Sequence, residues 1–140
     1  MQFPELSSIV PEYRSRNPLV RWLFHKRLDL ALGLARLKEE RALRVLDLGC
    51  GEGLVLGLLS LRHPQHALTG IDHNPNVLRL SIGSARFLCA DLTQPSGLPG
   101  GPFDRILCLD VLEHIQDLST PLRLIHEGLV SDGLLVVSAP

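Results

Sequence analysis

Three glycines at alternate positions follow an acidic residue and an apolar run in the stretch 44–53. The apolar run 45–48 is typical of a parallel strand that helices cover on both faces. Gly49, Gly51 and Gly53 accept positive φ angles and let a ligand lie against bare backbone. Polar ligands bind where such a strand ends and a helix begins. The stretch therefore predicts a ligand site at the end of the first strand.

The spacing of these glycines differs from that of the usual dinucleotide-binding loop. That loop has the pattern G-x-G-x-x-G, whereas this one reads G-x-G-x-G, with Asp47 two residues before the first glycine. Glu52 lies inside the turn and would repel a pyrophosphate. An anionic loop suits a ligand that has a positive centre and an amino-acid head. A nicotinamide-cofactor oxidoreductase is therefore a disfavoured alternative.

The stretch 45–53 resembles motif I of the class I S-adenosylmethionine (SAM) dependent methyltransferases. The resemblance continues at Asp72, at Asp91 and in the segment 104–114, which contains Val-Leu-Glu-His, and it covers about residues 44–138. In that family motif I packs against the methionine part of SAM. The acid at the position of Asp72 holds the ribose, and the acid at the position of Asp91 accepts from the adenine amino group. The resemblance implies a SAM-dependent methyltransferase. The cofactor-binding residues that it implies are Asp47, Gly49, Cys50, Gly51, Gly53, Asp72, His73, Asp91, Leu92 and Leu109.

The segment 110–115 lies where the reactive end of the cofactor is expected. Methyl transfer from a sulfonium is an in-line displacement, so catalysis can come largely from holding the acceptor and the methyl group in line. A general base is needed only where the acceptor must lose a proton. We expect Asp110, Glu113 and His114 to be the catalytic residues, with His114 as the candidate base. In the alternative, Glu113 and His114 cap the next helix or bond to the glycine loop.

The same segment also resembles a metal-binding motif. Asp110-x-x-Glu113-His114 is similar to the E-x-x-E-H of small-RNA 3′-end 2′-O-methyltransferases, and equally to the segment in ubiquinone-biosynthesis O-methyltransferases. The aspartate is one methylene shorter than the first glutamate of that motif, and no metal ligand is predicted. A metal-assisted RNA 2′-O-methyltransferase is one alternative function. A non-catalytic scaffold with the methyltransferase fold is another.

The elements that position these residues alternate between strand and helix. Alternation of this length specifies an α/β, Rossmann-like parallel sheet with helices on both faces.

Family members usually carry seven strands, whereas we expect about five here, without the antiparallel hairpin that the last two strands form. The apolar strand 134–138 would then be an open edge, so either the sequence is a fragment of a longer protein or another chain covers this edge. We expect aggregation or a homodimer through this strand. The expected strands are 45–48, 67–72, 85–90, 103–110 and 134–138, and the expected helices are 54–61, 76–81 and 120–129.

The first part of the chain, 1–43, is predicted to hold a lead-in and an amphipathic helix, and 44–140 the SAM-binding core of a single domain. Asn17 and Pro18 mark the start of the helix, which would run to about Lys38. We expect the helix to pack on the sheet or to close the cofactor pocket. A surface for lipid or for an acidic acceptor, near Trp22, is the alternative. The side predicted to be apolar contains Leu19, Val20, Leu23, Phe24, Leu30, Ala31, Leu34, Ala35 and Leu37.

Composition narrows the class of protein. Hydrophobic residues make up 45 % of the chain and charged residues 21 %, which is typical of a globular domain. Residues 1–44 hold nine Lys/Arg and five Asp/Glu, an excess too small to predict nucleic acid, so a small-molecule acceptor is favoured. No apolar run reaches the roughly 18 residues of a bilayer span. Without a signal peptide, and with three cysteines in no zinc-type spacing, the chain is predicted to be cytoplasmic.

Overall fold

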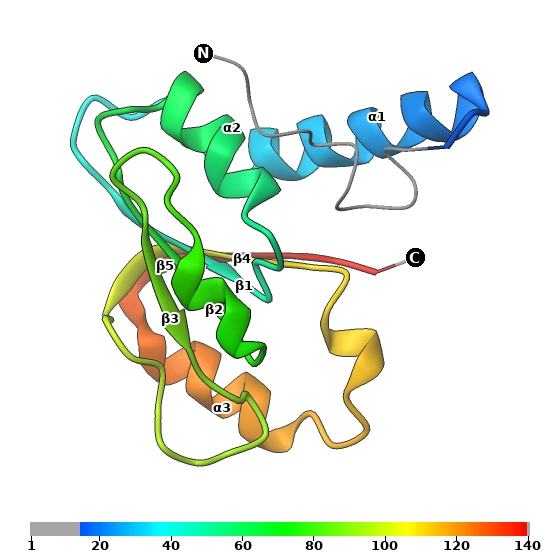
Figure 1. Ribbon diagram of the computed structural model, residues 1–140. Coiled ribbons are helices and arrows are strands. Elements are labelled where there is room, and N and C mark those ends of the chain that lie inside the picture. The colour runs from blue at the N-terminus through cyan, green and yellow to red at the C-terminus, as the bar shows by residue number, and fades with distance from the viewer. Residues whose placement is uncertain (1–14, 140) are drawn as a thin grey trace.

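The structure, a computed structural model, describes residues 15–139 and contains one five-stranded sheet between layers of helices (Figure 1). The predicted lead-in therefore lies almost wholly outside the described residues. The elements are α1 (Pro18–Leu34), β1 (Arg44–Leu48), α2 (Leu54–Arg62), β2 (Ala67–Asp72), the 3-10 helix η2 (Pro75–Arg79), β3 (Arg86–Cys89), β4 (Phe103–Leu109), the 3-10 helix η3 (Leu112–His114), α3 (Ser119–Gly128) and β5 (Leu129–Ser138).

The sheet has the strand order β3-β2-β1-β4-β5, and every neighbouring pair is parallel. Helices α1 and α2 cover one face and α3 covers the other (Figure 1), so the predicted Rossmann-like class is confirmed. Strand β5 begins at Leu129 rather than at the predicted 134, because the backbone becomes extended directly after α3. Its register against β4 is irregular between Phe103 and Arg105.

Strand β1 lies at the centre of the sheet and is buried on both faces. Val45 belongs to the apolar core under α1 and α2, whereas Leu46 and Leu48 belong to the core on the α3 side. Successive side chains of a strand point to opposite faces. Asp47 therefore points to the same side as Val45, and it is only 3 % exposed. The alternation of β1 thus places a carboxyl group beneath α1 and α2.

Helix α1 starts as predicted, with the Asn17 side chain accepting a hydrogen bond from the Leu19 amide at 2.9 Å. Its predicted end at Lys38 is wrong. The helix ends at Leu34, Arg36 takes a left-handed φ of 50°, and the chain then turns so that Leu37 is buried. The predicted apolar side is also largely wrong. Buried positions of the helix are Leu28, Ala31 and Leu32, while Leu19, Leu23, Leu30 and Leu34 are exposed.

The segment that joins α1 to β1 is held by two buried polar side chains. His66 is 4 % exposed; its Nδ1 accepts a hydrogen bond from the Leu43 amide, and its Nε2 donates to the Leu37 carbonyl at 2.7 Å. From β4, Arg105 donates to the Ala35 carbonyl at 2.8 Å and to Glu39. These bonds satisfy backbone groups of a segment that forms no sheet ladder. They fix where α1 lies relative to β1.

Asp104 anchors the opposite end of the sheet from the glycine loop. It accepts hydrogen bonds from the Arg44 amide at 2.8 Å and from the Arg41 guanidinium at 3.0 Å. The bond from the Arg44 backbone, and then the bond from Arg41, hold the pKa of this carboxyl below its usual value. Asp104 thus joins the start of β1 to the start of β4.

We predict that Asp104→Asn lowers the free energy of unfolding by about 1–3 kcal/mol at pH 7, because two partly buried hydrogen bonds lose their charged acceptor. A depressed pKa contributes stability that is complete above the unfolded value and is lost as pH falls through the folded value. The difference from the wild type should therefore shrink below about pH 4. Urea denaturation measures it, with the exposed Asp132→Asn as control. A difference independent of pH would contradict this role.

Candidate functional site

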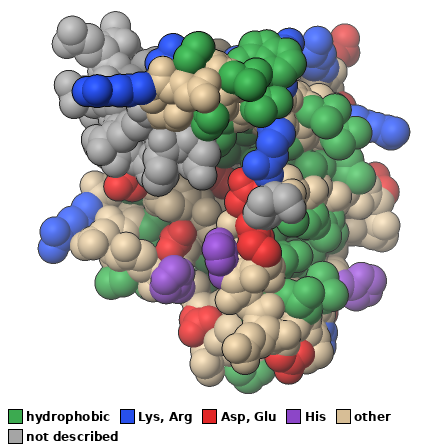
Figure 2. Space-filling view, turned by 90° about the vertical axis from the view of Figure 1, so that its right-hand side faces the viewer, with side chains coloured by type: hydrophobic (Ala, Val, Ile, Leu, Met, Phe, Trp, Pro, Cys, Tyr) green, Lys and Arg blue, Asp and Glu red, His purple; other side chains and the backbone are tan. Residues whose placement is uncertain are grey.

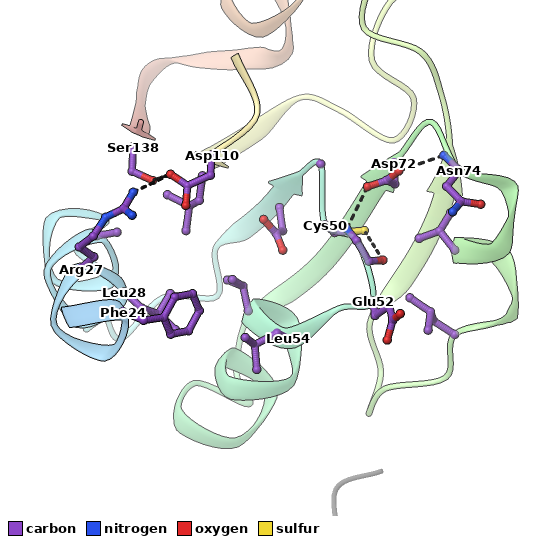
Figure 3. A pocket seen from close by; sticks show the side chains of 18 of the residues that line it. Phe24, Arg27, Leu28, Cys50, Glu52, Leu54, Asp72, Asn74, Asp110 and Ser138 are labelled. Atoms are coloured by element: carbon purple, nitrogen blue, oxygen red, sulfur yellow. Dashed lines mark hydrogen bonds and ion pairs between the residues drawn. The ribbon is translucent and has the colours of Figure 1, made fainter. Parts of the chain in front are cut away.

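The loop after β1 is tied to the end of β2 by backbone amides. The Gly49 and Cys50 amides both donate to the Ile71 carbonyl, at 2.7 and 3.1 Å. The Gly51 amide donates to the Asp72 carboxylate at 2.9 Å, and the other oxygen of Asp72 accepts from the Asn74 amide (Figure 3). The loop between β1 and α2 is therefore held in one shape by the strand beside it.

These bonds decide which ligands the loop can bind. A pyrophosphate is bound by backbone amides that point at the phosphate oxygens. Here three successive loop amides already donate to Ile71 and Asp72, and Glu52 lines the cavity beside them. The geometry thus disfavours the nicotinamide-dinucleotide alternative for the same loop.

The glycines of the loop serve two different purposes. Gly49 has a φ of 77°, and a Cβ there would lie 2.3 Å from Val111, so this glycine allows the loop to contact the chain after β4. Gly51 has a φ of 51° and nothing within 4 Å of the Cβ position. A side chain at Gly51 would therefore occupy open space beside the cavity. Gly53 caps α2 and packs near Ile82, and it lines neither of the cavities described below.

Two adjoining cavities surround the loop. The larger has a volume of about 630 Å³ and lies between α1, the glycine loop, the end of β2 and η2 (Figure 3). The smaller, of about 460 Å³, lies between the ends of β2, β3 and β4. Gly49, Asp72 and Asp110 line both. Of the predicted cofactor residues, Asp47, Cys50, Gly51 and Leu109 line the larger cavity, and His73, Asp91 and Leu92 line the smaller one.

Asp47 is a buried carboxyl group with an unsatisfied oxygen. Its Oδ2 is buried and has no hydrogen-bond partner in the part of the chain that the structure describes. Burial, and to a lesser extent the charge of Asp72, raise the pKa of Asp47 to about 7. A buried polar atom normally has a partner, and one without a partner requires an explanation. A cationic group in the cavity would supply both a hydrogen-bond donor and the missing positive charge.

Asp72 and Asp91 end neighbouring strands and line the smaller cavity together. Asp72 holds the glycine loop, and His73 lies 3.2 Å from its Oδ1 with its own ring largely exposed. Asp91 accepts hydrogen bonds at Oδ1 from the amide and the hydroxyl of Thr93, which lower its pKa. Both carboxylates are therefore oriented before any ligand binds.

Asp110 connects three elements at the edge of the larger cavity. Its Oδ1 accepts from Arg27 of α1 at 2.6 Å and from the hydroxyl of Ser138 on β5 at 3.1 Å (Figure 3). Its backbone has a left-handed φ of 56°, a strained conformation that clusters at functional sites. The Arg27 and Asp110 side chains are 47 % and 43 % exposed, so water screens this ion pair. The contact joins α1 to the end of the sheet.

Two of the three residues expected to be catalytic, Asp110 and His114, line the smaller cavity together. Asp110 pairs with Arg27, whereas the His114 ring lies 4.0 Å from Glu113, is 78 % exposed and lines the smaller cavity. Glu113 lines neither cavity. Within residues 15–139, no group of three His, Cys, Asp or Glu side chains is arranged to hold a metal ion.

The buried thiols are not nucleophiles. Burial is the main cause that raises the pKa of Cys50, and likewise that of Cys108, to about 12. The thiolate is the reactive form of cysteine. Both residues are therefore neutral near pH 7, and Cys50 contributes only a small apolar surface to the larger cavity.

Sequence patterns did not identify which residues of α1 and η2 line the larger cavity. Phe24, Arg27 and Leu28 of α1 line the larger cavity, as do Asn74 and Val77. The broad expectation that the first helix closes the pocket is consistent with this geometry. Helical periodicity places Arg27 beside the face that contains Phe24 and Ala31, so its position near the sheet could have been predicted. No sequence pattern indicates that its partner is Asp110.

Comparison with known proteins gives consistent matches. The family model described as "Methyltransferase domain" matches residues 20–140. The trans-aconitate 2-methyltransferase of Azoarcus sp. (strain BH72) is 32 % identical over 110 residues, which are 76 % of this chain and 43 % of that protein. The (S)-coclaurine N-methyltransferase of Thalictrum flavum subsp. glaucum is 28 % identical over 79 % of this chain and 32 % of its own length. The chain thus spans less than half the length of these curated relatives.

A solved structure gives the same result for the fold. A TehB-like SAM-dependent methyltransferase from Corynebacterium glutamicum superimposes with a TM-score of 0.63 and 26 % identity, covering 86 % of this chain and 73 % of that one. The strand order, the glycine loop at the end of β1 and the family match over residues 20–140 agree. The chain belongs to the methyltransferase-domain family, and the resemblance to class I SAM-dependent methyltransferases is confirmed.

Proposed function

We propose that the two cavities bind SAM and that the chain takes part in methyl transfer to a small-molecule acceptor. The observation that carries the proposal is the buried, unpartnered oxygen of Asp47 at the bottom of the larger cavity. SAM supplies a methyl group on a sulfonium and carries an ammonium group on its amino-acid end. A cation of this kind fits an anionic cavity whose loop amides are already engaged.

The residues around the loop support distinct roles for the proposed site. Asp47 and Glu52 favour a positively charged group, and the open space at Gly51 admits a ligand close to the backbone. Asp72 offers a fixed carboxylate to ribose hydroxyls, as in other nucleotide-binding sheets. Asp91 and Leu92, in the adjoining cavity, would face the adenine. Among the described residues that line the larger cavity, Arg27 is the only lysine or arginine, and it suits a carboxylate of the ligand.

The acceptor is proposed to enter between α1 and the segment 110–114. Two observations support a small molecule: the cavity is partly covered by α1, and the matched relatives are named for small substrates. The exposed His114 is the proposed base, where the acceptor must lose a proton.

The rival function is a scaffold that binds the cofactor without catalysis, and an assay for transfer of labelled methyl groups distinguishes the two. The metal-assisted RNA alternative has no supporting donor cluster within residues 15–139.

We predict that S-adenosylhomocysteine, the demethylated product, binds the wild type with a micromolar Kd in calorimetric titration. Asp72→Asn should weaken binding about 10–100-fold, because hydrogen bonds to a charged acceptor are lost. Gly51→Arg should abolish it by filling the cavity. The matched control is Gly97→Arg, because Gly97 also has a positive φ and open space around its Cβ position. Equal binding by the Gly51 and Gly97 variants would rule out the proposed site.

A second prediction concerns pH. A cationic ligand group beside Asp47 favours its ionised form, and the pKa of about 7 must then fall on binding. Below that pKa the site must lose a proton to bind, so the Kd for S-adenosylhomocysteine at pH 6 should be about tenfold weaker than at pH 8. Asp47→Asn should remove the dependence. Wild-type affinity that does not change between these pH values would contradict the role of Asp47.

We also propose that two copies of the chain pair through β5. Within residues 15–139, β5 pairs only with β4, and Val137 is 45 % exposed. An open apolar edge is a template for another strand, and a lysine there blocks pairing. Sedimentation velocity should show dimers of the wild type and of Val137→Thr, but monomers of Val137→Lys. A wild-type monomer at high concentration would contradict pairing.

A further inference from the structure

Helix α1 carries apolar side chains on two opposite faces. The inner face, which includes Leu28, Ala31 and Leu32, packs on the sheet. The outer face is open to solvent, with side chains 47–66 % exposed. A surface helix normally has one apolar face and one polar face. The outer apolar face of α1 consists of Leu19, Trp22, Leu23, Leu30 and Leu34.

These five side chains form a ridge along one side of the helix. At 100° per residue they fall within an arc of about 120°, and from Leu19 to Leu34 they extend over about 22 Å of helix. Hydrophobic side chains gather at the upper end of the molecule, where α1 lies, with lysine and arginine side chains next to them (Figure 2). The ridge is convex, because it is the outer side of a single helix. A flat or deformable apolar partner fits such a surface.

The charge around the ridge identifies the partner. Residues 15–38 contain six lysines and arginines, of which Arg27 pairs with Asp110, and a single acid, Asp29, which pairs with Arg62. Lys26 lies within the ridge, with its ammonium group 5.9 Å from the centre of the Trp22 ring. The whole chain has a net charge of −1, so this segment is basic against an acidic remainder. Basic residues around leucine and tryptophan side chains are typical of helices that lie in the surface of an anionic membrane.

We propose that α1 docks the protein on anionic lipid surfaces through this outer apolar face. No helix within residues 15–139 is long and apolar enough to cross a bilayer, so the contact is with the surface. A second copy is disfavoured as the partner, because pairing through α1 would bring two basic segments together. The inner face of the same helix lines the larger cavity. Docking would therefore hold the entrance to that cavity beside the lipid headgroups.

The test uses the full chain and vesicles of phosphatidylcholine with about 30 % phosphatidylglycerol, compared with phosphatidylcholine alone. Trp22 is the only tryptophan of the chain, so its fluorescence reports on the ridge directly. With anionic vesicles the emission should shift to shorter wavelength and brominated lipid should quench it. Added salt should reverse part of the binding, because the charges are exposed.

Substitutions locate the contact. Leu23→Glu with Leu30→Glu should reduce the fraction that sediments with anionic vesicles at least about tenfold, since two apolar anchors become charged. The control is Leu122→Glu with Leu78→Glu, which changes two comparably exposed leucines, 46 % and 58 %, on α3 and η2. Lys26→Glu should weaken binding to anionic vesicles. Circular dichroism melting checks that all variants fold.

Three results would overturn the proposal. The first is wild-type protein that does not sediment with anionic vesicles. The second is an equal loss of binding in the test and control pairs. The third is a change in Trp22 emission that follows protein concentration in the absence of lipid, which would assign the ridge to self-association. Because none of these measurements uses SAM, they test the docking surface independently of the proposed function.

Discussion

The attachment of the glycine loop to the end of β2 is the constraint on which the site depends. Ile71 and Asp72 accept the amides of three consecutive loop residues, and so the loop cannot move without breaking bonds to its neighbouring strand. This attachment engages three loop amides that could otherwise bind an anion, and Gly51 stays open to the cavity. It also fixes the start of α2. The preference for positive charge that we propose for this site thus rests on backbone geometry as much as on its carboxylates.

Much of this arrangement could be predicted from sequence because it rests on local patterns. A buried run ending in glycines specifies β1 and its loop, and acids at the following strand ends specify Asp72 and Asp91 at one rim. In a parallel sheet these ends share an edge, so neighbouring strands bring them together without further information. The cap at Asn17 is equally local. Strand ends and caps need only a few adjacent residues.

The remaining features depend on contacts between distant residues. Helix α1 has two apolar faces, and periodicity cannot tell which one meets the sheet. The contact between Arg27 and Asp110 joins residues 83 positions apart. His66 looks like a solvated loop residue in the sequence, but it is buried because the Leu37 carbonyl and the Leu43 amide need partners. Similarly, Glu113 and His114 both follow a strand tip, but only His114 lines a cavity there, whereas Glu113 lines neither.

The strand order has a consequence for how the chain acquires its fold. Every neighbouring pair is parallel, so no pair can form through a short hairpin, and each must wait for an intervening crossover. During synthesis β1 can pair with β2 early, but β4, its other neighbour in the sheet, begins only at Phe103. Long-range pairing of this kind slows folding and leaves apolar strands unprotected in intermediates. The central strand of the finished protein is therefore also enclosed late, and its apolar side chains stay open to solvent until β4 has been made.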